Sequence, residues 1–481
     1  MTSRRRRTHP VVLGLAGLLA VLAVPGLVLA VNAARFAAYR YAAPGPAAQA
    51  AVASVPPRPH DPAKPTAVVL VSDHGANVAD TLVPYDILAG TGAFNVYTVA
   101  PDRRPVPLLG GLDLVPDLGF AELEARLGGA APAVTVVPEM PDIDPATDAD
   151  DAPVTVWLRD RASRGLVLGV CTGARLVAEA GLIDGRPATS HWYRLAGLAD
   201  DHPQVAWQRG IRYVDDGDVV TTGGLLSSVD GTLRVVERLL GSPAAAEAAR
   251  RAGWSHYAPG SPSALPPSGL NLERAGTHVL DLGFRSGSTT FGVVLTDGVG
   301  ELDLAAAFAP YAEVKAARTL ALGDHAIRSR HGLTFVPRAG LPAVADVDRL
   351  LVPASAGGPL ISAAGTAAAW EGTPVERLGG APGGFAFDEA LRVMSRSMDR
   401  ATARWAAVIL EYPPEDLRLE GPAWPWGPTL AVLGLGLSGA AAAVGVSLLA
   451  CRRPRAHSDE PPPDGDPAAR SGAANESSVA G

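Results

Sequence analysis

The sequence contains few cysteines for its length, and this limits how the fold can be held together. Only Cys171 and Cys451 occur among 481 residues. An apolar run ends directly before Cys451, so we expect the two cysteines to lie on opposite sides of a membrane. A disulfide framework in the exported part of the chain is therefore excluded. Cys451 is predicted to be a passive residue at the membrane edge, with lipidation as an alternative.

The chain also lacks a basic patch outside its ends and lacks recognisable cofactor motifs. Its net charge is −8, and no basic patch interrupts the middle of the sequence, so nucleic-acid binding has no support. No group of histidines or carboxylates has the spacing of a metal site. The glycine-rich runs at 109–111 and 223–224 lack the phosphate-loop pattern. We therefore expect neither a metal nor another cofactor.

Apolar residues, by contrast, are abundant and form two long uncharged runs, 11–34 and 427–450. Each run exceeds the ~20 residues that span a bilayer core. Arginines lie outside both, at 4–7 and at 452–455, so the positive-inside rule places both termini in the cytoplasm and residues 35–424 outside it. Residues 1–10 are then a basic cytoplasmic N-terminus. Residues 451–481, without apolar periodicity, are a predicted disordered cytoplasmic tail.

Two alternatives remain for these apolar runs. The first run could be a cleaved signal peptide, because the small residues at 31–33 suit a cleavage site, although the run is longer than the usual ~7–15 residues. Both runs could also be buried core helices, a reading that leaves the flanking arginines unexplained.

Composition divides the rest of the chain into two folded units. An Ala/Pro-rich linker, 35–65, precedes a first unit at 66–240, in which short β-rich runs alternate with helical patterns. This alternation predicts an α/β fold with a parallel sheet covered on both faces. A second linker, 241–275, leads to another α/β unit, 276–412, that ends in one amphipathic helix at 387–410. The predicted strands of the first unit are Ala67–Val71, Phe94–Val99, Ala133–Val137, Leu166–Val170 and Val219–Thr221.

The two units share short sequence patterns and are predicted to be diverged copies. Gly111–Pro116 resembles Gly332–Pro337, and Val134–Pro138 resembles Leu350–Pro353. The second copy has no cysteine, and its residues 354–384 are mostly small. We expect it to be a degenerate, catalytically silent copy that buries a face of the first unit or holds a dimer.

The segment around Cys171 carries the strongest functional signal. An apolar run, a cysteine, a turn of small residues and a helical pattern together predict a strand, a sharp elbow and a helix. A helix N-terminus lowers the pKa of a thiol, so we expect a reactive thiolate. The backbone N–H groups of Thr172 and Gly173 are candidate oxyanion donors. The alternative is a buried, inert cysteine.

Residues 180–192, which read AGLIDGRPATSHW, and residues 213–224, which read YVDDGDVVTTGG, resemble the ThiJ/PfpI family. That family belongs to the class I glutamine amidotransferase-like superfamily, and the similar branch includes isocyanide hydratases and the sensory halves of AraC-type regulators. The resemblance covers the first unit and, more weakly, the front half of the second. It implies a flavodoxin-like sandwich, a nucleophile elbow at Cys171 and often a dimer.

The resemblance also implies an acidic residue beside the cysteine, and this position falls on Asp80. Asp80 could donate a proton to an intermediate or could simply cap the following helix. Where the family tends to have a Gly-Gly pair that supplies an oxyanion N–H, this chain has Pro138-Glu139-Met140. Among the histidines, His191 is the candidate base, with a structural histidine bonded to backbone as the alternative.

We therefore predict a membrane-anchored, extracytoplasmic cysteine-dependent hydratase or hydrolase, similar to isocyanide hydratases, that acts on an unidentified small molecule. The alternative is a non-enzymatic sensor or scaffold with a redox-responsive cysteine. A protease has less support, since nothing suggests a peptide groove. Expected partners are a membrane and either a second copy of the chain or, within one chain, the other unit.

Overall fold

The computed structural model describes residues 10–141, 152–161, 164–261, 264–265, 268–285, 289–355, 372–379, 383–413 and 417–452. Residues 1–9 and the predicted tail beyond 452 lie outside the described residues. Most of residues 354–384, where the second copy departs from the first, lie outside them as well.

The first unit is built on a seven-stranded sheet that is parallel except at one edge. Its strand order is β10-β11-β7-β6-β1-β2-β5, and only β10 and β11 pair antiparallel. The five predicted strands are all present, each within a residue or two of its expected bounds. The strands span β1 Thr66–Leu70, β2 Asn95–Ala100, β5 Leu118–Gly119, β6 Val134–Val137, β7 Leu166–Gly169, β10 Tyr213–Asp216 and β11 Val219–Thr222.

Both faces of this sheet are covered, which explains why its central strands are buried on every side. Ala67 and Val69 of β1 belong to one core cluster, whereas Val68 and Leu70 belong to another on the opposite face. This alternation is the two-residue period of a strand. The helices on the first face are α3 Val78–Gly90, α8 Ser227–Leu240 and α9 Ser242–Ala252; those on the other are α4 Phe120–Leu127, α5 Ala152–Arg161 and α6 Gly173–Glu179.

The second unit contains a smaller parallel sheet that repeats the central order of the first. Its order β13-β12-β16-β17 corresponds to β2-β1-β6-β7, and all its neighbouring strands are parallel. The strands are β12 Thr290–Val294, β13 Arg318–Leu322, β16 Arg349–Pro353 and β17 Val375–Leu378, and the helices are α10 Leu272–Phe284, α11 Glu301–Glu313, α14 Ala386–Ser397 and α15 Arg400–Ile409.

The two units meet through equivalent elements. Each unit contributes one hairpin: β3 (Val106–Leu108) and β4 (Leu112–Val115) from the first, and β14 (Ile327–Arg328) and β15 (Thr334–Val336) from the second. Strand β4 pairs antiparallel with β15, so the two hairpins form one four-stranded sheet. Leu114 lies opposite Phe335, its counterpart in the repeated motif, and the flanking positions exchange partners. Helices α3 and α11 also pack against each other. This self-complementary pairing has the geometry of an isologous dimer contact, although it lies within one chain.

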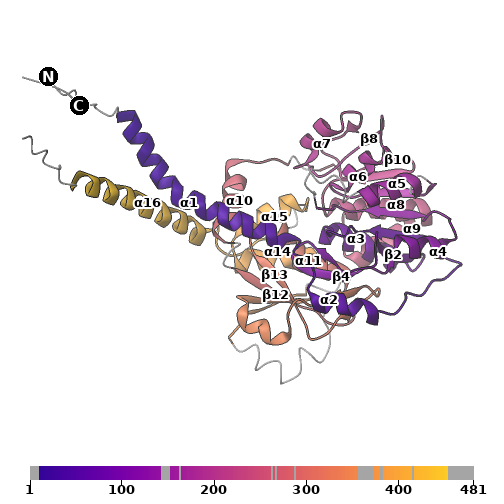
Figure 1. The fold of residues 1–481 in the computed structure, drawn as a ribbon. Helices are drawn as coiled ribbons and strands as arrows, with labels where there is room; N and C mark the ends of the chain where they lie inside the picture. Colours follow the sequence, from indigo (N-terminus) through magenta and orange to yellow (C-terminus); the bar gives the residue numbers. More distant parts are fainter. Residues whose placement is uncertain are drawn as a thin grey trace, which may run out of the picture.

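Two long apolar helices project together from the body of the molecule (Figure 1). Helix α1 (Pro10–Arg40) packs along α16 (Trp426–Arg452), and a Cβ on Gly439 would lie 2.3 Å from the carbonyl oxygen of Ala20. Glycine therefore permits the close helix approach that is common between membrane helices. The stretches Gly17–Arg40 and Trp426–Val446 are long and apolar enough to cross a bilayer, and only 6% and 11% of them are buried.

The last turns of α1 enter the body between the two units. The Tyr39 hydroxyl donates to the carbonyl oxygen of Gly110 (2.8 Å) in the first unit and accepts from the N–H of Thr319 (2.9 Å) in the second. The expected extended linker at 35–65 is therefore wrong over 35–40, which belong to α1, and over α2 (Pro46–Ala51), which is helical.

Two other expectations about 241–275 and 387–410 are also corrected. Part of the expected second linker forms α9, because its alanines favour a helix and bury one face, including Ala245 and Ala249, against the first unit. The single helix expected at 387–410 is two helices. The Asp399 side chain accepts from the N–H of Thr402 and caps the start of α15, so the chain turns there.

Candidate active site around Cys171

Cys171 sits at a strained elbow between β7 and α6. Its φ is 55°, which is uncommon for a residue other than glycine and stores backbone strain. Its N–H donates to the carbonyl oxygen of Gly223 (3.0 Å). At Gly173, a Cβ would lie 2.0 Å from the carbonyl oxygen of Val137, so only glycine allows α6 to start this close to the sheet. The predicted elbow is present.

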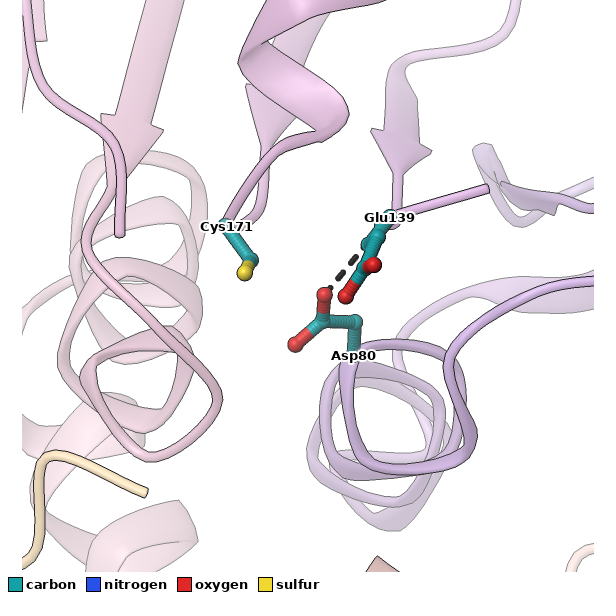
Figure 2. A group of neighbouring side chains, drawn as sticks. All are labelled: Asp80, Glu139 and Cys171. Atoms are coloured by element: carbon teal, nitrogen blue, oxygen red, sulfur yellow. Dashed lines mark hydrogen bonds between the residues drawn. The ribbon is translucent and has the colours of Figure 1, made fainter. Parts of the chain in front are cut away.

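Two carboxyl groups face the thiol. The side-chain oxygens of Asp80, in the first turn of α3, and of Glu139, directly after β6, lie with the Cys171 sulfur within 4.8 Å of one another. Figure 2 shows the three side chains pointing toward a common centre, and the Glu139 N–H donates to Asp80 Oδ2 (3.2 Å). Glu139 stands where the family tends to have a Gly-Gly pair, and its N–H is therefore already engaged by Asp80.

Asn77 organises this group and was missed in the sequence. Its Oδ1 accepts from the N–H groups of Ala79 and Asp80, so Asn77, and not Asp80, caps α3. Its Nδ2 donates to Glu139 Oε2 (3.0 Å) and to Glu313 Oε1 (2.5 Å), a residue at the end of α11. One amide thus links the helix start to carboxylates from both units.

The thiol faces a cavity that the whole chain builds. Cys171 is 3% exposed and lines a space of about 90 Å³. The walls come from the first unit, the second unit and the last turn of α1. The lining side chains with polar or aromatic character are Arg40, Glu139, Thr172, His191, Tyr193, Arg194, His278, Glu313, Lys315 and Trp405.

Burial and nearby negative charge raise the pKa of the Cys171 thiol well above its ordinary value. Burial is the largest cause, followed by the carboxyl groups of Asp80, Glu139 and Glu313, while the Thr172 N–H opposes them weakly. The expectation of a thiolate favoured by the helix N-terminus is therefore wrong for this arrangement. Helix α6 has only seven residues, and its partial charge is outweighed by three carboxyl groups.

The same surroundings raise the pKa of Asp80. Burial contributes most, followed by Glu139 and Glu313, so the acid form of Asp80 is favoured over its carboxylate. Burial and Glu139 also raise the pKa of Glu313 to about 7.

Cations offset part of this negative charge. Arg40 Nη2 lies 3.2 Å from Glu139 Oε1. Burial lowers the pKa of Lys315, which has a positive φ of 59° and lines the same cavity. Burial and Lys315 lower the pKa of His278 to about 4, so this histidine is neutral at pH 7. Asp80, Glu139 and Cys171 are close enough to share a metal ion, but Arg40 and Asn77 already engage the Glu139 carboxylate.

The remaining predicted residues are placed less favourably for catalysis. His191 lines the cavity, but its Nε2 lies 2.9 Å from the carbonyl oxygen of Ile409, as in the structural alternative. The Gly173 N–H, a candidate oxyanion donor, already donates to the carbonyl oxygen of Val170 (2.8 Å). The Thr172 N–H faces the sulfur and stays available.

Sequence reasoning missed Arg40, His278, Glu313 and Lys315. No local pattern points to them, because they reach the cavity only when α1 and the second unit pack against the first. Asn77 could have been found, since asparagine directly before a helical pattern favours the N-cap position.

Comparisons with known proteins match the first unit to one family. The DJ-1/PfpI family model matches residues 66–238. The isonitrile hydratase of Pseudomonas putida is 30% identical over 164 residues, which are 34% of this chain and 67% of that protein. The chain belongs to the DJ-1/PfpI family.

The other matches include a transcriptional regulator and a protein of solved structure. The HTH-type transcriptional regulator GlxA of Rhizobium meliloti is 29% identical over 205 residues, 42% of this chain, and the match spans only 59% of the regulator's own length. A ThiJ/PfpI family protein from Pseudomonas syringae is 26% identical, with a TM-score of 0.35 over 41% of this chain and 79% of that one.

Proposed function

We propose that this DJ-1/PfpI protein is a membrane-anchored, extracytoplasmic hydratase or hydrolase that uses Cys171 on a small molecule. One observation carries the proposal: a strained cysteine that lines a small cavity lies beside Asp80, a buried carboxyl group whose pKa is raised. A space of about 90 Å³ admits a reacting group of only a few heavy atoms. The similarity to an isonitrile hydratase suggests a carbon–nitrogen multiple bond, or an amide, as that group.

The chemistry follows from the roles of three groups. The Cys171 sulfur bonds to the electrophilic carbon, and Asp80 delivers a proton to the substrate as negative charge develops. The thiol proton returns to Asp80, and the Thr172 N–H stabilises the adduct. At a carbon–nitrogen multiple bond, water then adds to the same carbon and passes one proton to the nitrogen. The new hydroxyl becomes a carbonyl as the carbon–sulfur bond breaks, and its proton returns to the thiol. An amide instead loses its amine, which takes a proton from Asp80, and water then hydrolyses the thioester. The net reaction is addition of one water molecule.

The test compares Cys171→Ser with Cys451→Ser in the full-length protein. Small isonitriles, nitriles and amides are supplied, and product is measured by mass spectrometry. Cys171→Ser should abolish turnover, whereas Cys451→Ser should retain it. Unchanged turnover in Cys171→Ser would exclude this mechanism.

A sensor or scaffold is the second candidate, and two observations speak against the enzyme and for the scaffold. The pKa of the Cys171 thiol is raised, and the N–H groups of Glu139 and Gly173 are both engaged. A sensor would form a sulfenic acid at Cys171 with peroxide and show no turnover. Turnover separates the two: conversion of any of the small isonitriles, nitriles or amides indicates the enzyme, and a sulfenic acid at Cys171 without conversion indicates the sensor.

The proposed topology has both termini in the cytoplasm and the two units outside, with the pairing of units within one chain replacing a homodimer. Helix α1 supports an uncleaved anchor, because it runs without a break past residues 31–33 and packs along α16. N-terminal sequencing of the purified membrane protein tests this. A mature protein that starts near residue 34 would refute the anchor.

A further inference from the structure

A second group of chemically active side chains lies across the interface between the two units. Asp86 comes from α3, Glu301 begins α11, and His331 lies between β14 and β15. Their ligand atoms all lie within 4.8 Å of one another. His331 Nδ1 is 2.9 Å from Glu301 Oε2 and 3.7 Å from Asp86 Oδ1. None of these residues belongs to the Cys171 cavity.

The group is buried, and one of its carboxyl oxygens has no hydrogen-bond partner among the described residues. Asp86 is 8% exposed and Glu301 is fully buried. Among the described residues, no hydrogen-bond partner reaches Asp86 Oδ1, which faces the imidazole of His331. A single histidine faces both carboxyl groups, and the nearby Arg330 reaches toward Asp303 (3.7 Å). A divalent cation between the three side chains would offset the free-energy cost of burying the two carboxyl groups.

Outer hydrogen bonds hold the Glu301 side chain and the His331 backbone in place. Glu301 Oε1 accepts from the Ser329 hydroxyl (2.6 Å) and from the His331 N–H (2.9 Å), which leaves Oε2 directed at the group. The His331 carbonyl oxygen accepts from Arg58 Nη1 (2.7 Å) and from the Tyr85 hydroxyl (3.2 Å). Metal ligands are oriented by such second partners, whereas a chance meeting of side chains lacks them.

We propose that Asp86, Glu301 and His331 bind one divalent transition-metal ion that cross-links the two units, with Zn²⁺ the best match. Imidazole nitrogens and carboxylate oxygens are both zinc ligands, and three protein ligands would leave a fourth position open. A space of about 170 Å³ adjoins Asp86 and His331 and has room for the water that completes the coordination. On binding, the ion replaces the contact between His331 Nδ1 and Glu301 Oε2.

The experiment uses full-length, detergent-solubilised protein carrying Cys171→Ser and Cys451→Ser, so that no thiol competes for metal. After treatment with a chelator, Zn²⁺ is titrated by calorimetry, and thermal unfolding is followed with and without Zn²⁺. We expect one ion per chain and a rise in Tm on saturation. Asp86→Asn and His331→Gln should each weaken binding by tenfold or more, and Ser329→Ala, which changes only an outer partner, should weaken it by about tenfold.

His325→Gln serves as the matched control. His325 lies 3.6 Å from Asp297 in an exposed pair outside the group, so its loss should leave Zn²⁺ affinity unchanged. If His331→Gln fails to fold, Asp86→Asn and Ser329→Ala still decide the question. Absence of saturable binding, or binding that stays unchanged in both of these variants, would overturn the proposal and leave a metal-free ion pair between the units.

Discussion

Replacing Glu139 by glutamine should lower the pKa of the Cys171 thiol. The Glu139 carboxylate is one of the three carboxyl groups that raise this pKa, and it lies with the sulfur and Asp80 within 4.8 Å. Glutamine has nearly the same size and keeps an oxygen that can accept from Asn77. The substitution therefore removes charge from the site while changing its packing little.

The expected size of this shift follows from the charges. At 4.8 Å, the longest separation within this group, two unit charges interact by about 3.5 kcal/mol at an effective dielectric constant of about 20, which is roughly 2.5 pKa units. Arg40 pairs with Glu139 at 3.2 Å and already offsets part of its charge. Because Arg40 offsets part of the Glu139 charge, we expect the pKa of the Cys171 thiol to fall by about one to two units in Glu139→Gln.

The assay measures the pH midpoint for alkylation of Cys171. The protein carries Cys451→Ser, so that Cys171 is its single thiol, and iodoacetamide labelling is followed by mass spectrometry from pH 6 to 11. The midpoint is compared because its value does not depend on how easily the reagent enters the cavity. Repeating the series in an Asp80→Asn background removes the competing titration of Asp80.

Glu124→Gln provides the matched control. Glu124 also pairs with an arginine, Arg161, at 2.5 Å, but on the surface away from the cavity. Its loss should leave the midpoint unchanged. A midpoint in Glu139→Gln that equals or exceeds that of the parent protein, in both backgrounds, would show that the charge argument for the thiol is wrong.

Three further predictions test the fold. Burial raises the pKa of Asp281 from 3.8 to about 7, so this carboxyl group lowers the stability of the fold as pH rises from about 4 to 7. Asp281→Asn should therefore stabilise the protein by up to about 4 kcal/mol at pH 8 and little at pH 4, as measured by thermal unfolding. In this variant Arg285 keeps its other partner, Asp399, at 2.7 Å. Asn77→Ala should cost about 1 kcal/mol from the lost cap, measured by denaturant unfolding. Phe335→Ala, at the centre of the pairing between units, should cost about 3–5 kcal/mol by the same measurement, and a loss under 1 kcal/mol would argue against tight pairing.

Much of the first unit could be predicted because its signals are local. Five short β-rich runs became strands, since a strand buried on both faces needs a continuous apolar run. The helix α9 was missed because its alanines and Pro243 resemble linker composition, and only packing against the first unit distinguishes the two. The break between α14 and α15 depends on one capping side chain, Asp399, inside an otherwise periodic pattern.

The candidate site was predictable only in part, for a physical reason. The elbow at Cys171 is determined by consecutive residues, and the resemblance to a family pointed to Asp80. The charge of the site is set by Glu139, Glu313 and Arg40, which come from distant parts of the chain. A thiolate was expected because the helix N-terminus is a local feature, whereas the carboxyl groups that outweigh it are brought together by tertiary packing.

The expected role of the second unit as a silent partner needs revision on these grounds. The family match ends at residue 238, yet Glu313, Lys315 and His278 complete the cavity that the thiol faces. Arg40, at the end of the apolar helix α1, reaches Glu139 in the same space. Any movement of α1 or of the second unit must therefore change the charge around the sulfur. The protonation of Cys171 is thus a property of the assembled chain, and the family-matched region alone should carry a thiol with different reactivity.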